Sequence, residues 1–244
     1  MPWLLGWEGA AAGGRDAEAE LRKAFEVSLH AGTAAALLLA LRRDLGALGL
    51  REAWLIGLSA APPALAGYAL ERPVERHLGT PPAIAGGLLV GAVMIAVADR
   101  ATGQRAYRNA RLVDWLWLGL GEAAALVPGV SRTGATLAAA RSRGFSRIAA
   151  HRLSRYAGLP VIAGATLLKT VRLAEHGADG ETRRRLGAGA AAAFVSTLGA
   201  AQLIPWLERD RPLWPYAAYR AGLAMIVLRR LANGTSGRCS TMRL

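Results

Sequence analysis

The stretch Pro128-Gly129-Val130-Ser131-Arg132-Thr133-Gly134-Ala135-Thr136 interrupts a long apolar segment with a turn, several hydroxyl groups and one guanidinium group. The Pro-Gly pair ends a helix, and Ser131 is a favoured N-cap residue for a new helix that continues to Ala140. A helix start offers free backbone N–H groups and the positive end of the helix dipole. Arg132 stays protonated and adds a planar fork of donors that fits two phosphate oxygens. The stretch therefore predicts an anion site inside a broken helix.

The composition of the whole chain indicates a membrane protein. Hydrophobic residues make up 53% of the 244 residues, although the formal net charge is +13. Three uncharged runs are about long enough to cross a bilayer, which takes roughly 20 residues. They are Ala53–Leu70, Thr80–Ala98 and Leu186–Leu207, and the less regular candidates are Ala24–Leu41, Leu112–Ala140, Arg155–Leu168 and Leu213–Leu228. We predict an all-α fold, a polytopic integral membrane helical bundle with broken or re-entrant helices.

The basic excess is almost all arginine, because lysine occurs only at positions 23 and 169. The arginine clusters lie between or just after the apolar segments, which is typical of charges that flank a membrane and meet anionic headgroups. Nucleic-acid binding is the competing interpretation, but these residues are spread over many loops and no nucleic-acid-binding motif accompanies them. The single cysteine, Cys239, excludes an intrachain disulfide and a cysteine-based metal site.

The alternation of apolar runs and short polar connections predicts one domain. We expect a single membrane-embedded helical domain over residues 1–232 and a disordered polar tail over residues 233–244. The longest hydrophilic interruption is His176–Arg185, which carries the turn signal Asp179-Gly180.

Several blocks of the sequence together resemble the bacterial undecaprenyl-diphosphatase family. The block Gly121-Glu122-Ala123-Ala124-Ala125-Leu126-Val127-Pro128-Gly129-Val130-Ser131-Arg132-Thr133-Gly134-Ala135-Thr136 resembles the family's Pro-Gly-x-Ser-Arg-Ser-x-x-Thr signature with its usual lead-in. Phe25–Thr33, Trp54–Gly87 and Tyr216–Arg220 are similar to further segments of the family. The resemblance covers residues 2–231, nearly the whole chain.

The resemblance implies an integral-membrane enzyme of the bacterial plasma membrane. Members of the family remove one phosphate from the C55 polyprenyl diphosphate carrier of cell-wall synthesis. The expected partners are this lipid substrate and membrane lipids, without nucleic acid, and a homodimer is one of the assemblies considered. The implied catalytic residues are Arg132, Ser131 and Thr136, and the implied substrate-binding residues are Gly129, Thr133, Gly134 and Glu122.

One departure from the family pattern concerns the start of the chain. The family begins with a signature of two glutamates spaced four apart followed by Ser-Ser-Thr-Gly-His, and Met1–Trp7 is similar to the stretch after that histidine. Glu8 does not replace the missing glutamates, because Gly and Ala follow it. The family implies a divalent cation, Mg²⁺ or Ca²⁺, with the missing glutamates as ligands, so we assign no metal ligand in this chain. We expect little or no hydrolysis by the 244-residue form and restoration by its upstream coding region.

Each assigned residue also has a structural interpretation. Arg132 could form a purely structural pair with Glu122 or Asp114, since a buried guanidinium group requires a partner. Ser131 could act only as a helix cap, and the hydroxyl of Thr136 could bond back to a backbone carbonyl. For Glu122, a structural salt bridge and a polar contact in the site are about equally supported. The histidines show no metal-ligand spacing, and we expect His30 to be buried and to share a hydrogen bond.

Two further functions are compatible with these motifs. Broken helices around an anion site at the membrane midplane also describe a carrier that flips a polyprenyl phosphate across the membrane. An inactive remnant of the phosphatase is the other alternative. Release of inorganic phosphate from polyprenyl diphosphate distinguishes the enzyme from a carrier, because a pure carrier releases none.

Overall fold

The computed structural model describes residues 15–175, 180–207 and 209–240, and within these ranges the chain is helical without a β-strand. The all-α prediction is therefore confirmed for the described residues. Met1–Trp7, Glu8, His176, Asp179 and the last four residues of the predicted tail lie outside these ranges. The elements are α1 (Arg15–Ala40), α2 (Arg42–Gly46), α3 (Leu50–Leu58), α4 (Ala61–Leu78), α5 (Pro81–Asp99), the 3₁₀ turn η3 (Tyr107–Asn109), α6 (Leu112–Ala124), α7 (Arg132–Ser142), α8 (Arg147–Glu175), α9 (Gly180–Ala201), α10 (Ile204–Leu207) and α11 (Trp214–Ser240).

Three segments of the described chain are long enough and apolar enough to cross a membrane. They are Leu50–Leu70, Pro81–Asp99 and Gly180–Trp206, and they match the three uncharged runs predicted from the sequence. A shorter apolar helix covers Ala24–Ala40. The chain is thus a multi-pass membrane protein. α11 continues through Ser240, into the segment for which the sequence predicts a disordered tail.

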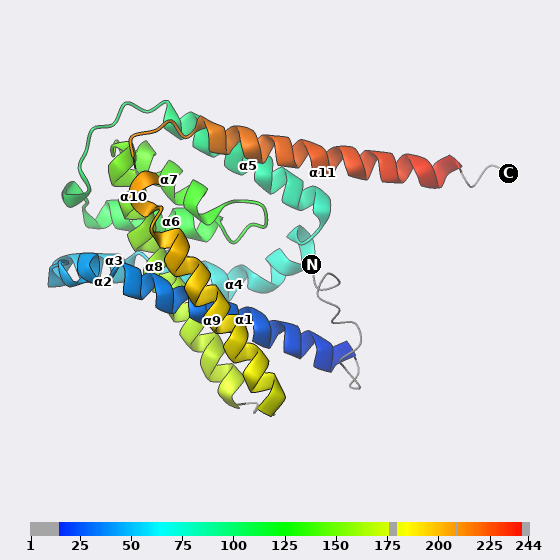
Figure 1. Ribbon diagram of the computed structural model, residues 1–244. Helices are drawn as coiled ribbons and strands as arrows, with labels where there is room; N and C mark the ends of the chain where they lie inside the picture. The colour runs from blue at the N-terminus through cyan, green and yellow to red at the C-terminus, as the bar shows by residue number, and fades with distance from the viewer. Residues whose placement is uncertain (1–14, 176–179, 208, 241–244) are drawn as a thin grey trace. The chain divides into compact units, whose positions relative to one another are not determined.

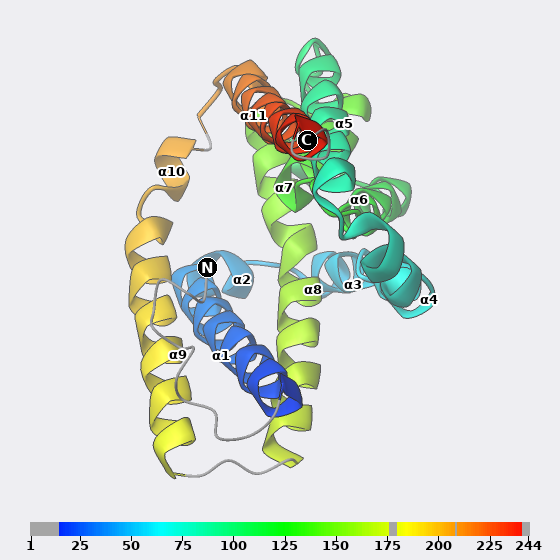
Figure 2. The same cartoon turned by 90° about the vertical axis from the view of Figure 1, so that its right-hand side faces the viewer.

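The contacts within the chain define two compact units, and the prediction of one domain stays a prediction. The first unit contains the described residues up to position 47 together with residues 162–204. In this unit α1 packs along α9 (Figure 2), and small residues allow the helices to approach closely. A Cβ atom on Gly32 would lie 2.0 Å from the carbonyl oxygen of Ala190, so the two backbones touch.

The second unit contains residues 48–161 and the described residues from 205 onward, and it holds all the predicted site residues. Its α5 packs between α11 and α7, whereas α6 packs against α7, α4 and α3. Figure 1 shows α11 lying along α5. The two helices are antiparallel, because the start of α11 binds the end of α5 at Asp99 while Arg220 lies against Gly91. These helices position the 125–131 loop, which joins α6 to α7.

The α6–α7 pair is a re-entrant hairpin. At 1.5 Å per residue the two helices are roughly 20 Å and 17 Å long, shorter than the roughly 30 Å of a bilayer's hydrocarbon core. Asp114, in the first turn of α6, accepts hydrogen bonds from Arg105 at 2.8 Å and from Arg143 at 2.8 Å. Since Arg143 directly follows α7, the start of α6 and the end of α7 lie next to each other. This geometry confirms the predicted broken helix.

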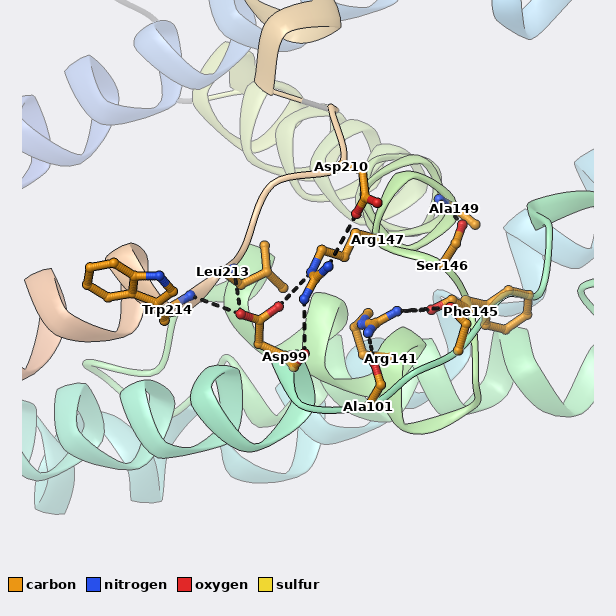
Figure 3. Close-up of polar contacts among 11 residues, drawn as sticks. Asp99, Ala101, Arg141, Phe145, Ser146, Arg147, Ala149, Asp210, Leu213 and Trp214 are labelled. Atoms are coloured by element: carbon orange, nitrogen blue, oxygen red, sulfur yellow. Dashed lines mark hydrogen bonds and ion pairs between the residues drawn. The ribbon is translucent and has the colours of Figure 1, made fainter.

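A largely buried carboxylate ties three helices of the second unit together (Figure 3). Asp99, at the end of α5, accepts hydrogen bonds from Nε of Arg147 at 2.7 Å and from the backbone N–H of Leu213 at 2.8 Å. The N–H of Trp214 also points to this carboxylate, at 3.3 Å, so Asp99 caps the start of α11. Arg147 reaches a second carboxylate, Asp210, at 3.3 Å, but that side chain is largely exposed. The network fixes the register of α11 against α5.

We predict that Asp99→Asn destabilises the protein much more than Asp210→Asn does. Both substitutions remove one carboxylate bound to Arg147, but the side chain of Asp99 is only 10% exposed, whereas that of Asp210 is 66% exposed. Loss of a buried charged partner costs about 2–4 kcal/mol, whereas an exposed ion pair contributes about 0–1 kcal/mol. Thermal unfolding in detergent micelles should show a Tm lower by about 5–10 °C for Asp99→Asn and nearly unchanged for Asp210→Asn. Equal shifts would contradict the role assigned to Asp99.

Candidate active site

The 125–131 loop turns the chain from α6 into α7. α6 ends at Ala124, and Gly129 has a φ of 93°, a conformation that residues with a side chain rarely adopt. Ser131 follows in extended conformation, and its Oγ accepts a hydrogen bond from the N–H of Gly134 at 3.2 Å. Its carbonyl accepts from the N–H of Ala135 at 2.8 Å, so Ser131 is the N-cap of α7, as predicted.

Glycines allow the loop to lie directly on the backbone of α5. A Cβ atom on Gly129 would lie 2.2 Å from the carbonyl oxygen of Ile84, and one on Gly87 would lie 2.2 Å from that of Pro128. Gly134, in the first turn of α7, faces Ile95, whose Cδ1 would lie 2.7 Å from an added Cβ. The loop therefore has no room for side chains on the side that faces α5.

Arg132, the first residue of α7, is paired with Glu122 of α6. Its NH1 donates to Oε1 of Glu122 at 3.1 Å. The side chain of Arg132 is 36% exposed and that of Glu122 only 1%. Glu122 is one of the two partners of Arg132 considered from the sequence. The other, Asp114, binds Arg105 and Arg143 instead. The guanidinium group thus binds a buried carboxylate through NH1, while the Arg132 side chain as a whole stays partly exposed.

The three hydroxyl groups of the motif lie in different surroundings. Ser131 is half-buried and Thr133 is exposed, both at the open start of α7. Thr136 is fully buried. Its hydroxyl lies within hydrogen-bond distance of two backbone carbonyl oxygens that can accept its proton, that of Arg132 at 2.9 Å and that of Thr133 at 3.2 Å. Its hydroxyl also forms a hydrogen bond with Ser154 of α8. The structure therefore brings Ser131, Arg132 and Thr133 together and places the Thr136 hydroxyl in the interface with α8.

Four further residues belong to the site although the sequence did not assign them to it. On α5, Gly87 contacts the loop and Gly91 contacts Arg220. On α8, Gly158 contacts Arg132 and Ser154 binds Thr136. The spacing of four between Gly87 and Gly91 places both on one helix face, and this was the signal that could have identified them. Ser154 and Gly158 share the same spacing on α8.

Arg220 of α11 donates a hydrogen bond to the carbonyl oxygen of Gly129. Gly91 leaves room for this side chain, since an added Cβ would lie 2.9 Å from NH2 of Arg220. Arg220 thus anchors α11 to the loop itself. Its neighbour Tyr219 is 71% exposed.

The electrostatics of the site favour an anion. The guanidinium groups of Arg132 and Arg220 and the start of α7 lie around the loop, and Glu122 is the carboxylate that balances them. No group of three or more His, Cys, Asp or Glu side chains that could hold a metal ion occurs in the described part of the chain. His30 bonds to the carbonyl of Glu26 at 2.6 Å as expected, but it is exposed, so its predicted burial was wrong.

Known proteins resemble the chain over most of its length. The model of the family described as bacitracin resistance protein BacA matches residues 3–226. An undecaprenyl-diphosphatase of Geobacter sulfurreducens is 38% identical over 239 residues, which cover 90% of this chain and 84% of the relative. An undecaprenyl-diphosphatase of Geobacter metallireducens is 36% identical, over 90% of this chain and 84% of the relative. One of Thermomicrobium roseum is 33% identical, over 93% of this chain and 87% of the relative.

Proposed function

The chain belongs to the bacitracin resistance protein BacA family, and from this membership we propose that it is a membrane phosphatase that converts a polyprenyl diphosphate to the monophosphate. Its place in lipid-carrier recycling for the cell wall and in the bacterial plasma membrane is part of the same proposal. The observation that supports it best is the position of Arg132, half-exposed at the open start of α7 and held by a buried carboxylate. A homodimer stays a prediction.

The diphosphate would bind where the donors of α7 converge. The N–H of Gly134 already donates to the Ser131 hydroxyl. The N–H groups of Arg132 and Thr133, at the start of α7, are the donors that a phosphate oxygen would bind. The Ser131 hydroxyl accepts from the N–H of Gly134, so its own proton remains available for a phosphate oxygen. The exposed hydroxyl of Thr133 offers another donor. The guanidinium edge of Arg132 formed by Nε and NH2 has no partner among the described residues and fits two phosphate oxygens.

The reaction breaks the bond between the terminal phosphorus and the bridging oxygen. A water molecule supplies the new oxygen on phosphorus and gives up a proton, while the bridging oxygen leaves with its electron pair on the lipid monophosphate. Negative charge therefore grows on the bridging oxygen and stays spread over the transferred phosphoryl group. Arg132 and the N-terminal end of α7 are fixed donors beside that charge, and donors that need no rearrangement stabilise it most effectively.

The described residues do not by themselves fit the divalent cation that the family resemblance implies. Mg²⁺ and Ca²⁺ take six or more oxygen ligands, and the protein supplies carboxylates among them. The loop region offers one carboxylate, Glu122, and one of its oxygens already binds Arg132. We assign no step to a metal ion, and the metal dependence stays a prediction.

Purified protein in detergent micelles tests the proposed function. Calorimetric titration should show that polyprenyl diphosphate binds and that the uncharged polyprenol does not. Inorganic phosphate is then measured for the 244-residue chain and for a form extended at its start by the family's glutamate and Ser-Ser-Thr-Gly-His signature. Release by either form supports the phosphatase, whereas binding without release by both forms would favour the lipid-phosphate carrier. Absence of binding would reject both functions.

A further inference from the structure

Glu122 is buried at a cost that its surroundings do not recover. Its side chain is 1% exposed, and Oε1 receives one hydrogen bond, from Arg132. Oε2 is buried and has no hydrogen-bond donor among the described residues. A buried carboxylate oxygen without a donor destabilises a protein, and such atoms are rare and call for an explanation. Functional sites are the usual places where this cost is retained.

Gly158 of α8 provides the space in which the same guanidinium group rests. A Cβ atom on Gly158 would lie 1.7 Å from NH1 of Arg132 and 2.7 Å from its Cζ. The hydrogen bond between Thr136 and Ser154, one turn before Gly158, holds α7 against this part of α8. Any side chain at position 158 would therefore push NH1 away from Glu122.

Both contacts fall first on NH1 of the guanidinium group. Glu122 binds NH1, and an added Cβ on Gly158 would lie 1.7 Å from NH1 and 3.1 Å from NH2, whereas Nε and NH2 have no hydrogen-bond partner within the described ranges. A flexible arginine side chain loses considerable rotamer freedom when it is fixed. Fixing it before the substrate arrives lowers the entropy cost of binding, and it also directs the remaining edge.

We propose that Glu122 and Gly158 are positioning residues, which hold Arg132 by NH1 so that its Nε–NH2 edge faces the phosphate. This inference rests on the proposed function. Glu122 acts through a hydrogen bond to Oε1, and its charge is not needed for that bond. A glutamine at position 122 therefore replaces it, and the loss of a negative charge next to the anion site leaves diphosphate binding unchanged or tighter.

Binding of a short-chain polyprenyl diphosphate, farnesyl diphosphate, is the first test. Glu122→Ala should weaken binding about tenfold, the equivalent of one charge-assisted hydrogen bond, and Glu122→Gln should bind within threefold of the wild type or more tightly. Gly158→Ala should weaken binding at least tenfold. The control is Gly164→Ala in the same helix, where an added Cβ meets nothing within 4 Å. Unchanged binding by both Glu122→Ala and Gly158→Ala, or equal losses for Glu122→Gln and Glu122→Ala, would overturn the inference.

A double-mutant cycle tests the pair without any ligand. Glu122→Ala and Arg132→Ala each leave one buried or half-buried charge without its partner, so each should lower the Tm by several degrees in detergent. The double variant should lose clearly less than the sum of the two shifts. Additive shifts would show that Glu122 does not hold Arg132, even if the wild type binds diphosphate. Coupling together with no diphosphate binding by the wild type would reject the proposed function and leave the pair confirmed.

Discussion

Replacing Arg132 by alanine is expected to weaken the binding of polyprenyl diphosphate by about 100-fold or more. The reason is the loss of a bidentate, charge-assisted contact, which contributes about 2–5 kcal/mol, and each 1.4 kcal/mol corresponds to a factor of ten. Arg132→Lys keeps the charge but not the planar fork, so it should retain part of the affinity and lose about tenfold. Calorimetric titration in micelles measures both, and phosphate release in the form that turns over should fall at least as far.

Two controls separate this effect from misfolding and from a general loss of charge. Arg132→Ala leaves the buried Glu122 without its partner, so the substitution is repeated in a Glu122→Gln background, where no charge remains unpaired. Arg229→Ala removes the same charge from an exposed position in α11. We expect the double variant to fold and to bind poorly, and Arg229→Ala to bind like the wild type. If Arg132→Ala and Arg229→Ala lowered affinity equally, Arg132 would have no specific role.

Gly129→Ala is expected to abolish the site by moving the loop away from α5. Alanine at a φ of 93° costs about 1–3 kcal/mol in backbone strain. The added methyl group would also lie 2.2 Å from the carbonyl oxygen of Ile84. Because that oxygen belongs to the backbone of α5, the clash can be relieved only by a shift of the loop. Because Ser131 and Arg132 follow within three residues, a displaced loop carries both away from their partners. Diphosphate binding should fall about 100-fold or more, and the Tm should fall by several degrees.

The neighbouring glycines of α5 offer a matched comparison for this prediction. Gly87→Ala adds a methyl group 2.2 Å from the carbonyl oxygen of Pro128 and should impair binding from the opposite side of the same contact. At Gly86 an added Cβ meets nothing within 4 Å, so Gly86→Ala should bind normally and stabilise α5 by about 1 kcal/mol. Equal behaviour of Gly86→Ala and Gly87→Ala would contradict the backbone contact.

Local chemistry made much of the fold predictable from the sequence. The uncharged runs gave the three candidate spans because a bilayer sets the length of apolar helices. The end of one helix and the N-cap of the next were predicted from Pro128, Gly129 and Ser131, because these residue types restrict or bind the backbone next to them. Glu122 was one of the two carboxylates considered as a partner of Arg132, because a buried guanidinium group requires a partner.

The parts that depend on contacts between distant segments could not be predicted in this way. Gly158 is one of 29 glycines in the sequence, and its role follows only from the approach of α8 to α7. The bond from Arg220 to the loop requires α11 to run antiparallel to α5, which Asp99 fixes by capping α11. The direction of the Thr136 hydroxyl toward Ser154 likewise depends on packing.

Arg132, at the start of α7, is the residue that we expect to bind the diphosphate directly. The most direct measurement is an experimental structure with a polyprenyl methylenediphosphonate, in which a carbon bridge prevents hydrolysis. We expect phosphonate oxygens within about 3 Å of Nε and NH2 of Arg132, with NH1 still bound to Glu122. A diphosphonate bound elsewhere, with the free edge of Arg132 unoccupied, would contradict it.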